Sequence, residues 1–161
     1  MIEGKLRNMA TIYIKDNDKM LLLERIGSKV VNRSWCGIGG HFKSKELNDA
    51  KACVLREMKE EIGLKEKDID NLALRYIALR VVDGELRLNY YFFADLKQGV
   101  EITKHCPEGN LEWVELDKVN EKEMPFTAQK VLEHYLETGI NTNDFYSVST
   151  NEDVVISTLC E

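Results

Sequence analysis

The 161-residue sequence has few cysteines and no apolar run long enough for a membrane helix. The four cysteines are Cys36, Cys53, Cys106 and Cys160. They form neither a CxxC pair nor the Cys/His spacing of a zinc site, which favours free thiols in a reducing compartment. The first ten residues lack the apolar segment of a signal peptide. The longest apolar runs are of strand length, far below the roughly 20 residues that cross a bilayer. We therefore expect a cytoplasmic protein without membrane contact.

The sequence also lacks an excess of basic residues. It has 22 Lys and Arg against 28 Asp and Glu, for a formal net charge of −6. Proteins that bind the nucleic-acid backbone usually present a basic face, so this balance argues against a nucleic-acid partner. An acidic protein that handles phosphates usually needs a cation to mediate the contact.

Strand-like and helical segments follow one another in an order typical of α/β proteins. Short β-rich runs precede one helix, further β-rich runs follow it, and a second helix comes last. The predicted strands cover residues 11–15, 20–24, 35–38, 72–78, 79–82, 85–96 and 111–116, and the second helix covers 128–138. A turn at Asp83-Gly84 predicts a hairpin. This order predicts an α/β/α sandwich, in which a mixed β-sheet is packed between helices.

Capping residues predict where both helices begin and end. Asn48 or Asp49 is a good N-cap for the first helix, and Gly63 is a good residue to end it. Thr127 is the expected cap of the second helix and Gly139 its expected end. The apolar stripe of the first helix is predicted to comprise Ala52, Leu55, Met58 and Ile62.

The C-terminal segment differs in composition from the rest of the chain. Residues 1–139 are predicted to form a single domain, and residues 140–161 are a tail rich in Asn, Ser, Thr and acids. The sequence leaves two alternatives for this tail, an added strand near residues 154–156 or a loosely ordered segment.

Three acidic residues on the first helix are the most informative feature. Glu60 and Glu61 lie three and four residues after Glu57, so all three side chains project from nearly the same face. Their mutual repulsion is relieved by a hard divalent cation such as Mg²⁺, which prefers carboxylate oxygens. Arg56 lies four residues before Glu60 and is placed to pair with it or with an acid of the preceding loop. Taken alone, however, the fragment more often belongs to a solvated helix surface.

The residues around the fragment make it specific. Gly39-Gly40 ends a strand before the helix, Glu46 lies in the loop, and Gly63-Leu64 follows the helix. Together they resemble the box of the Nudix hydrolase family, Gly, five residues, Glu, seven residues, then Arg-Glu-aliphatic-x-Glu-Glu-x-Gly-aliphatic. Residues 56–64 match its second half, and Gly40 and Glu46 match its first. Nine residues rather than seven separate Glu46 from Arg56.

The resemblance implies a metal site and roles for its residues. It implies that Mg²⁺, with Mn²⁺ as a substitute, is held by the helix acids and a loop carbonyl. The implied ligands are Glu57, Glu60, Glu61 and the carbonyl of Gly40. Arg56, Glu57, Glu60 and Glu108 are the implied catalytic residues, and Glu46 supports Arg56. The general base is either Glu108 or a helix glutamate, with Glu112 as a further alternative.

The resemblance also implies a substrate class, a nucleoside diphosphate linked to another group. The first reading is a house-cleaning hydrolase that cleaves an oxidised-purine-type nucleoside triphosphate to the monophosphate and pyrophosphate. The alternatives are an ADP-ribose or dinucleotide pyrophosphatase and a non-catalytic nucleotide-binding regulatory domain. Arg25, Lys29 and Arg33 are candidates for contact with substrate phosphates. The chain is expected to be a monomer or a homodimer, and the preferred base and sugar stay open.

Overall fold

The computed structural model describes residues 5–26, 33–103, 105–151 and 153–159. Strands dominate this part of the chain, and two α-helices accompany them. In chain order the elements are β1 (Leu6–Asp16), β2 (Lys19–Arg25), β3 (Ser34–Cys36), β4 (Ile38–His41), α1 (Ala50–Ile62), β5 (Ile69–Val82), β6 (Glu85–Leu96), β7 (Gly109–Glu115), α2 (Phe126–Glu137), β8 (Tyr146–Thr150) and β9 (Val154–Thr158). Short 3-10 helices η1 (Ser44–Glu46), η2 (Glu66–Asp68), η3 (Leu116–Glu121) and η4 (Gly139–Asn141) lie between them.

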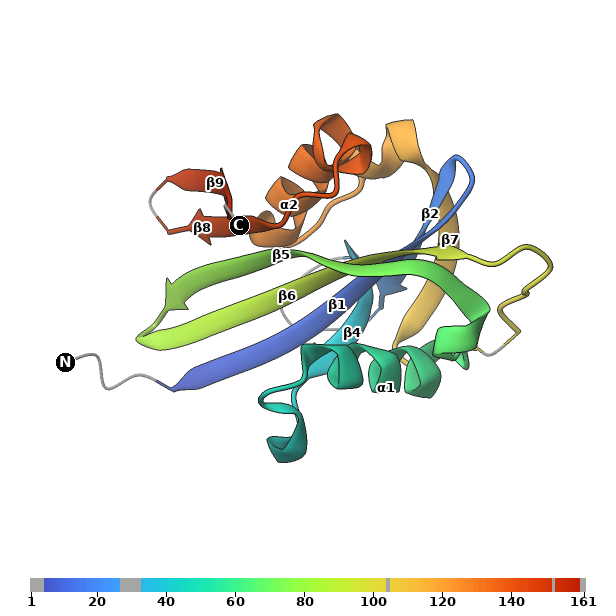
Figure 1. Cartoon of the computed structure of the whole chain (residues 1–161), viewed down its shortest axis with the longest axis horizontal. Helices are drawn as coiled ribbons and strands as arrows, with labels where there is room; N and C mark the ends of the chain where they lie inside the picture. The colour runs from blue at the N-terminus through green and yellow to red at the C-terminus, as the bar shows by residue number, and fades with distance from the viewer. Residues whose placement is uncertain (1–4, 27–32, 104, 152, 160–161) are drawn as a thin grey trace.

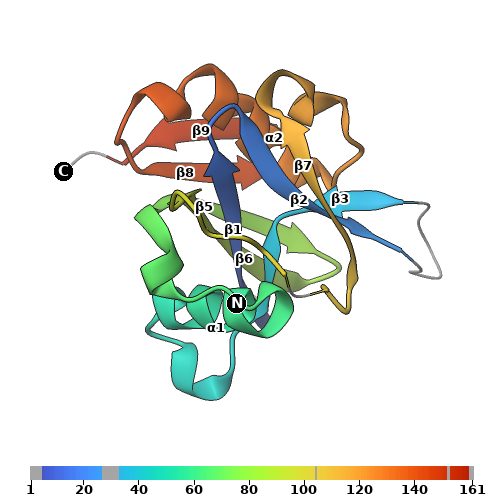
Figure 2. The same ribbon diagram turned by 90° about the vertical axis from the view of Figure 1, so that its right-hand side faces the viewer.

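The strands form one mixed sheet that separates the two helices. Its main path runs β3-β2-β1-β6-β5-β8-β9, with β4 paired to β1 and β7 paired to β2. The β1–β6 and β5–β8 pairs are parallel, and the other pairs are antiparallel. Helices α1 and α2 lie on opposite sides of the sheet (Figures 1 and 2). The predicted α/β/α sandwich with a mixed sheet is therefore confirmed.

Apolar side chains alternate between the two faces of the central strands and form two hydrophobic cores. On β1, Ile12 and Ile14 face α1 and pack in one core with Met58, whereas Tyr13 faces α2 and packs in the other core with Val131. All five side chains are fully buried. Because successive strand residues point to opposite faces, one strand serves both layers. The sheet is thus covered on both sides, and its central strands form a rigid support for the loop at β4.

Helix α1 begins and ends as its caps predict. The Asp49 carboxylate accepts a hydrogen bond from the Ala52 backbone N–H at 2.9 Å. Gly63 ends the helix in the left-handed conformation, with φ of 78°. The predicted buried stripe is confirmed at Met58 and Ile62, whereas Ala52 and Leu55 are only partly buried. The buried apolar positions are Cys53, Val54, Met58 and Ile62.

The predicted ends of the second helix are wrong. Helix α2 begins at Phe126 after Pro125, so Thr127 lies in its first turn rather than capping it. The Thr127 hydroxyl instead pairs with the hydroxyl of Thr150 at 2.9 Å, and both residues are buried. Gly139 does not end the helix either, because Thr138 is the C-cap and η4 starts at Gly139. Contacts distant in sequence override the local capping preference here.

Strand β5 is longer than predicted, whereas β6 has its predicted bounds. The two runs predicted at 72–78 and 79–82 form the single strand β5. The hairpin turn to β6 is confirmed, with φ of 51° at Asp83 and 74° at Gly84. In the C-terminal segment, β8 pairs in parallel with β5, and β9 pairs with β8.

Three of the four cysteines lie within the described residues. Cys36, Cys53 and Cys106 are free thiols, and Cys160 lies outside the described residues. In the part of the chain that the structure describes, neither helix has the length and apolar character required to cross a bilayer.

Candidate active site

Arg56 is held by a buried carboxylate from the loop before α1. Its Nε donates to Glu46 Oε1 at 2.7 Å and its Nη2 donates to Glu46 Oε2 at 2.9 Å. Glu46, which ends η1, is 3% exposed and also accepts from the Lys43 backbone N–H at 2.8 Å. These bonds, the Arg56 bonds foremost, lower the pKa of Glu46 to about 2. The loop with two extra residues therefore still delivers Glu46 to Arg56.

The other side of the Arg56 guanidinium holds acids of α1. Nη1 donates to Glu57 Oε1 at 2.6 Å and to Glu60 Oε2 at 3.0 Å, and Nη2 donates to the carbonyl of His41 at 3.1 Å. Arg56 thus ties the end of β4 to the helix. Glu60 is half exposed and also accepts from Lys43 Nζ at 3.2 Å. Lys43 and then Arg56 lower the pKa of Glu60.

Gly40 leaves room for Glu57 against the backbone of β4. A Cβ at this position would lie 2.6 Å from Glu57 Oε1, closer than a real Cβ atom approaches a neighbouring atom. Register with β1, where Gly40 is opposite Ala10, holds the loop in place. Only a residue without a side chain lets the carboxylate lie against the strand. The backbone of Gly40 and the carboxylate of Glu57 are therefore neighbours, as a shared metal site requires.

Glu61 is a buried carboxyl without a hydrogen-bond partner of normal geometry. The residue is 4% exposed, and neither side-chain oxygen is bonded. Burial above all, and then the charges of Glu108 and Glu57, raise the pKa of Glu61 to about 8, against the smaller lowering effects of Arg25 and the Gly39 backbone amide. An unpaired buried carboxylate is costly unless a cation accompanies it.

Glu108 joins the group through the pairing of two distant strands. Arg25 of β2 is opposite Gly109 of β7, which brings the preceding residue, Glu108, to the arginine. Arg25 Nη2 donates to Glu108 Oε2 at 2.9 Å, and both side chains are about half exposed. Glu108 is close enough to Glu61 to raise its pKa. The structure therefore brings Arg25 and Glu108 to the helix acids.

Two other candidates pair with groups outside the acids of α1. Arg33 is largely exposed and pairs with Glu24 at 3.5 Å, and Glu112 pairs with Lys122 at 3.1 Å. Neither is among the groups that perturb Glu61. Lys29 lies outside the described residues.

The residues present fit a hard divalent cation by their chemistry. Within the described ranges, no three Asp, Glu, His or Cys side chains converge closely enough to bind an ion as they stand. Arg56 Nη1 lies instead between Glu57 and Glu60. The donors are nevertheless all oxygens, as Mg²⁺ prefers, and the two unpaired oxygens of Glu61 lack the positive partner that an ion supplies.

Mg²⁺ is expected to raise the melting temperature (Tm) of the protein, and Glu61→Gln is expected to remove most of that rise. At ten times its Kd the ion adds about 1.4 kcal/mol of stability, or roughly 3–6 °C for a chain of this size. Differential scanning fluorimetry with MgCl₂ against EDTA measures the shift. Glu66→Gln is the matched control, because Glu66 pairs with Lys51 at the surface, outside the acid group. An equal shift in all three proteins would contradict the role of Glu61.

Sequence reasoning missed two parts of this arrangement. Lys43 supports both Glu46 and Glu60, and the Cys53 thiol lies 3.8 Å from the carbonyl of Gly40. Cys53 directly follows Ala52, the first position of the predicted stripe, and is buried where Ala52 is only partly buried.

Comparisons with known proteins identify the family and the fold of the chain. The family model described as NUDIX domain matches residues 5–135. The Mutator MutT protein from Bacillus halodurans superposes with a TM-score of 0.71 at 22% identity, covering 94% of this chain and 97% of that one. The E. coli ORF135 protein gives 0.69 at 16% identity, covering 89% and 99%. A C. elegans Ap4A hydrolase gives 0.65 at 18% identity, covering 86% and 99%. At these identities the structures show the fold alone, whereas the family model covers most of the chain, and the chain therefore belongs to the NUDIX domain family of hydrolases.

Proposed function

We propose that the protein is a Mg²⁺-dependent hydrolase that cleaves nucleoside triphosphates to the nucleoside monophosphate and pyrophosphate. The observation that carries the proposal is the buried, unpaired carboxyl of Glu61 beside Glu57 and Glu108. Such a group has no structural use, because it costs stability and returns no hydrogen bond. It fits a cation that meets a phosphate chain, and the family acts on nucleoside diphosphate derivatives with a divalent metal.

Each residue has a task in this reaction. Glu57, Glu60, Glu61 and the carbonyl of Gly40 would hold Mg²⁺, and Arg56, anchored by Glu46, orients the first two. When bound, Mg²⁺ neutralises nonbridging phosphate oxygens and makes a water more acidic. Glu108 or a helix glutamate accepts the proton of the attacking water. The 2.9 Å contact of Arg25 with Glu108 supports a role for Arg25 in binding a phosphate oxygen.

Within this proposal, an oxidised purine nucleoside triphosphate is the first substrate to test. An ADP-ribose or dinucleotide pyrophosphatase is the second candidate, since the similar C. elegans structure is of an Ap4A hydrolase. A regulatory domain that binds nucleotide without cleaving it is the third. The full set of acids speaks against the third, because a binding domain has no need of a buried unpaired carboxyl.

A nucleotide panel with Mg²⁺ tests the proposal. The panel contains ordinary and 8-oxo-purine nucleoside triphosphates, ADP-ribose and a diadenosine polyphosphate, with release of pyrophosphate, phosphate and monophosphate followed separately. We expect pyrophosphate and monophosphate from a triphosphate, loss of turnover in EDTA, and recovery with Mg²⁺ or Mn²⁺. Nucleotide binding without turnover would overturn the proposal in favour of a regulatory domain.

A further inference from the structure

A small cavity lies next to the acid group on the α2 side of the sheet. Its volume is about 140 Å³, and its lining includes Tyr13, Arg25, Gly39, Arg80, Asn89 and Ala128. Sites for whole drug-sized ligands begin at roughly 300 Å³, so this cavity has the size for one ring system rather than a complete nucleotide. Arg25 also touches Glu108, and Gly39 precedes Gly40. A ligand whose phosphates meet the acids therefore has its base within reach of the cavity.

Three buried polar atoms of the cavity lining have no hydrogen-bond partner. They are the hydroxyl of Tyr13, Nε of Arg80 and Oδ1 of Asn89. Buried polar atoms are nearly always bonded, so three on the lining of one cavity require an explanation. A polar ligand provides one, and ordered water is the alternative that the experiment below separates.

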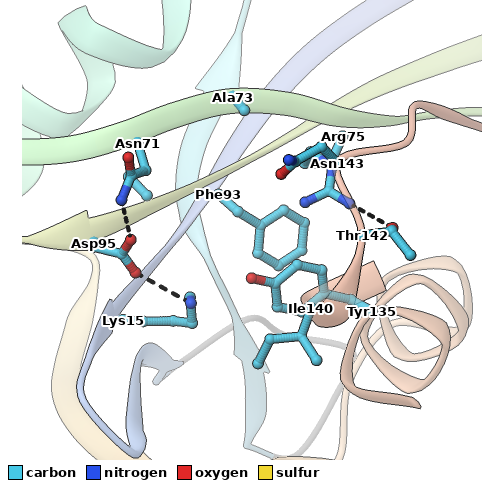
Figure 3. A pocket seen from close by; sticks show the side chains of 11 residues that line it. Lys15, Asn71, Ala73, Arg75, Phe93, Asp95, Tyr135, Ile140, Thr142 and Asn143 are labelled. Carbon is cyan, nitrogen blue, oxygen red and sulfur yellow. Dashed lines mark hydrogen bonds and ion pairs between the residues drawn. The ribbon is translucent and has the colours of Figure 1, made fainter. Parts of the chain in front are cut away.

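A second cavity shows the contrasting case (Figure 3). It lies between β5, β6 and the end of α2, and its polar side chains already bind one another. Asp95 accepts from Asn71 at 2.8 Å and pairs with Lys15 at 3.1 Å, and Arg75 donates to Thr142 at 3.2 Å. These polar groups therefore have partners within the protein, whereas Arg80 Nε and Asn89 Oδ1 do not.

Arg80 and Asn89 are neighbours on one face of the sheet. Asn89 of β6 is opposite Ala78 of β5, and Arg80 follows two residues later on the same face. Such diagonal neighbours lie roughly 7–8 Å apart at the backbone, so both side chains reach one flat ligand. Asn89 Nδ2 donates to the Tyr91 hydroxyl at 3.2 Å, which leaves Oδ1 for the cavity. The two side chains thus present a charged donor beside a neutral acceptor.

We propose that Arg80 and Asn89 read the base of the substrate and select bases with a carbonyl oxygen beside a ring N–H. A carbonyl oxygen suits the charged donor of Arg80, and the ring N–H suits Oδ1 of Asn89. Guanine, hypoxanthine and uracil present this order. Adenine and cytosine present the reverse order, an amine beside a ring nitrogen acceptor, and a phosphate chain fixed at the acids prevents the base from turning over. The proposal rests on the proposed function and names its substrate class.

The test compares kcat/KM for GTP, ITP and ATP with the full chain and Mg²⁺. ITP isolates the carbonyl and ring N–H, because hypoxanthine lacks the second amine of guanine. We expect GTP and ITP to exceed ATP at least about tenfold, which corresponds to about 1.4 kcal/mol and lies within the range of one base contact. Arg80→Met and Asn89→Leu should bring the ratio of kcat/KM for GTP or ITP to that for ATP near one. Asn89→Asp, which keeps the acceptor oxygen, should retain a preference for GTP and ITP.

Control variants distinguish a loss of base selectivity from a loss of folding. Arg87→Met is the matched variant, because Arg87 is opposite Arg80 in register but its Nε already donates to Glu85 at 2.7 Å. It should keep the ratio of the unaltered protein. If Arg80→Met does not fold, Arg80→Lys keeps the charge, lacks the Nε–H, and should lose the ratio as well.

The outcomes distinguish this proposal from the proposed function. Hydrolysis of all three nucleotides without preference, or an unchanged ratio in folded Arg80→Met, overturns the reading by Arg80 and Asn89 and leaves the hydrolase proposal standing. Absence of hydrolysis of these three nucleotides and of the 8-oxo-purine nucleoside triphosphates overturns the hydrolase proposal. Calorimetric binding of IMP and AMP with Mg²⁺ then tests base selection without turnover, because a monophosphate has no phosphoanhydride bond to cleave. Tighter binding of IMP than of AMP, lost in Arg80→Met, supports base selection by Arg80 and Asn89. Equal affinities for IMP and AMP, or binding of neither, overturn it and leave water as the partner of the unbonded cavity atoms.

Discussion

Replacing Glu60 with glutamine is expected to lower kcat at saturating Mg²⁺ by at least about a hundredfold. The change keeps the shape of the side chain but removes a negative charge from the group that holds the cation, a loss that costs factors of this size in metal and acid–base catalysis. It also releases one of the two carboxylates that Arg56 Nη1 binds, so the position of Glu57 is less well defined.

Stability should change little in the same variant. The side chain of Glu60 is 52% exposed, and exposed ion pairs contribute at most about 1 kcal/mol. Steady-state kinetics over a range of Mg²⁺ concentrations, together with thermal unfolding, separates the two effects. Glu66→Gln, which changes an exposed acid of the same type outside the group, should retain full activity. Full activity in both Glu57→Gln and Glu60→Gln would contradict the assigned mechanism.

Local signals in the sequence predict the helix that carries the acids. Asp49 and Gly63 act within one turn of the chain, so their effect on α1 depends on nothing distant. The side-chain direction of Glu57, Glu60 and Glu61 follows from helical spacing alone. These parts of the candidate site can therefore be read from the sequence.

Other parts depend on pairings between segments far apart. Arg25 and Glu108 meet because β2 pairs with β7, and no local pattern specifies that register. Thr127 was expected to cap α2, but its hydroxyl binds Thr150 of β8, a strand that the polar composition of the C-terminal segment conceals. The burial that perturbs Glu61 is likewise a property of the packed structure.

Replacing Arg56 with methionine is expected to lower both stability and activity. Glu46, 3% exposed, would lose both guanidinium bonds, and breaking a buried ion pair costs on the order of 3–5 kcal/mol. For a chain of this length the melting temperature should fall by roughly 6–20 °C. Activity should fall with it, because Glu57 and Glu60 lose the group that orients them.

A double-mutant cycle with Glu46→Gln shows whether the pair acts as a unit. The double variant should be less destabilised than the two single changes predict by more than about 1 kcal/mol, since neither partner then leaves a buried charge alone. Arg87→Met, which breaks the more exposed pair with Glu85, should cost less than about 1 kcal/mol. Additive effects in the cycle, or a melting temperature of Arg56→Met close to that of the unaltered protein, would contradict the role of the pair.

The pH dependence supplies an independent check on the same pair. The pKa of Glu46 is lowered to about 2 in the folded protein, mainly by the hydrogen bonds of Arg56, from an ordinary value of 4.5. A lowered pKa means that the pair stabilises the fold fully above pH 4.5 and loses this contribution as pH falls toward 2. The difference in unfolding free energy between the unaltered protein and Arg56→Met should therefore be constant near neutrality and shrink below pH 4.5. A difference that stays the same at pH 3 would mean that packing of the arginine stem, and not its bond to Glu46, is what stabilises the loop against α1.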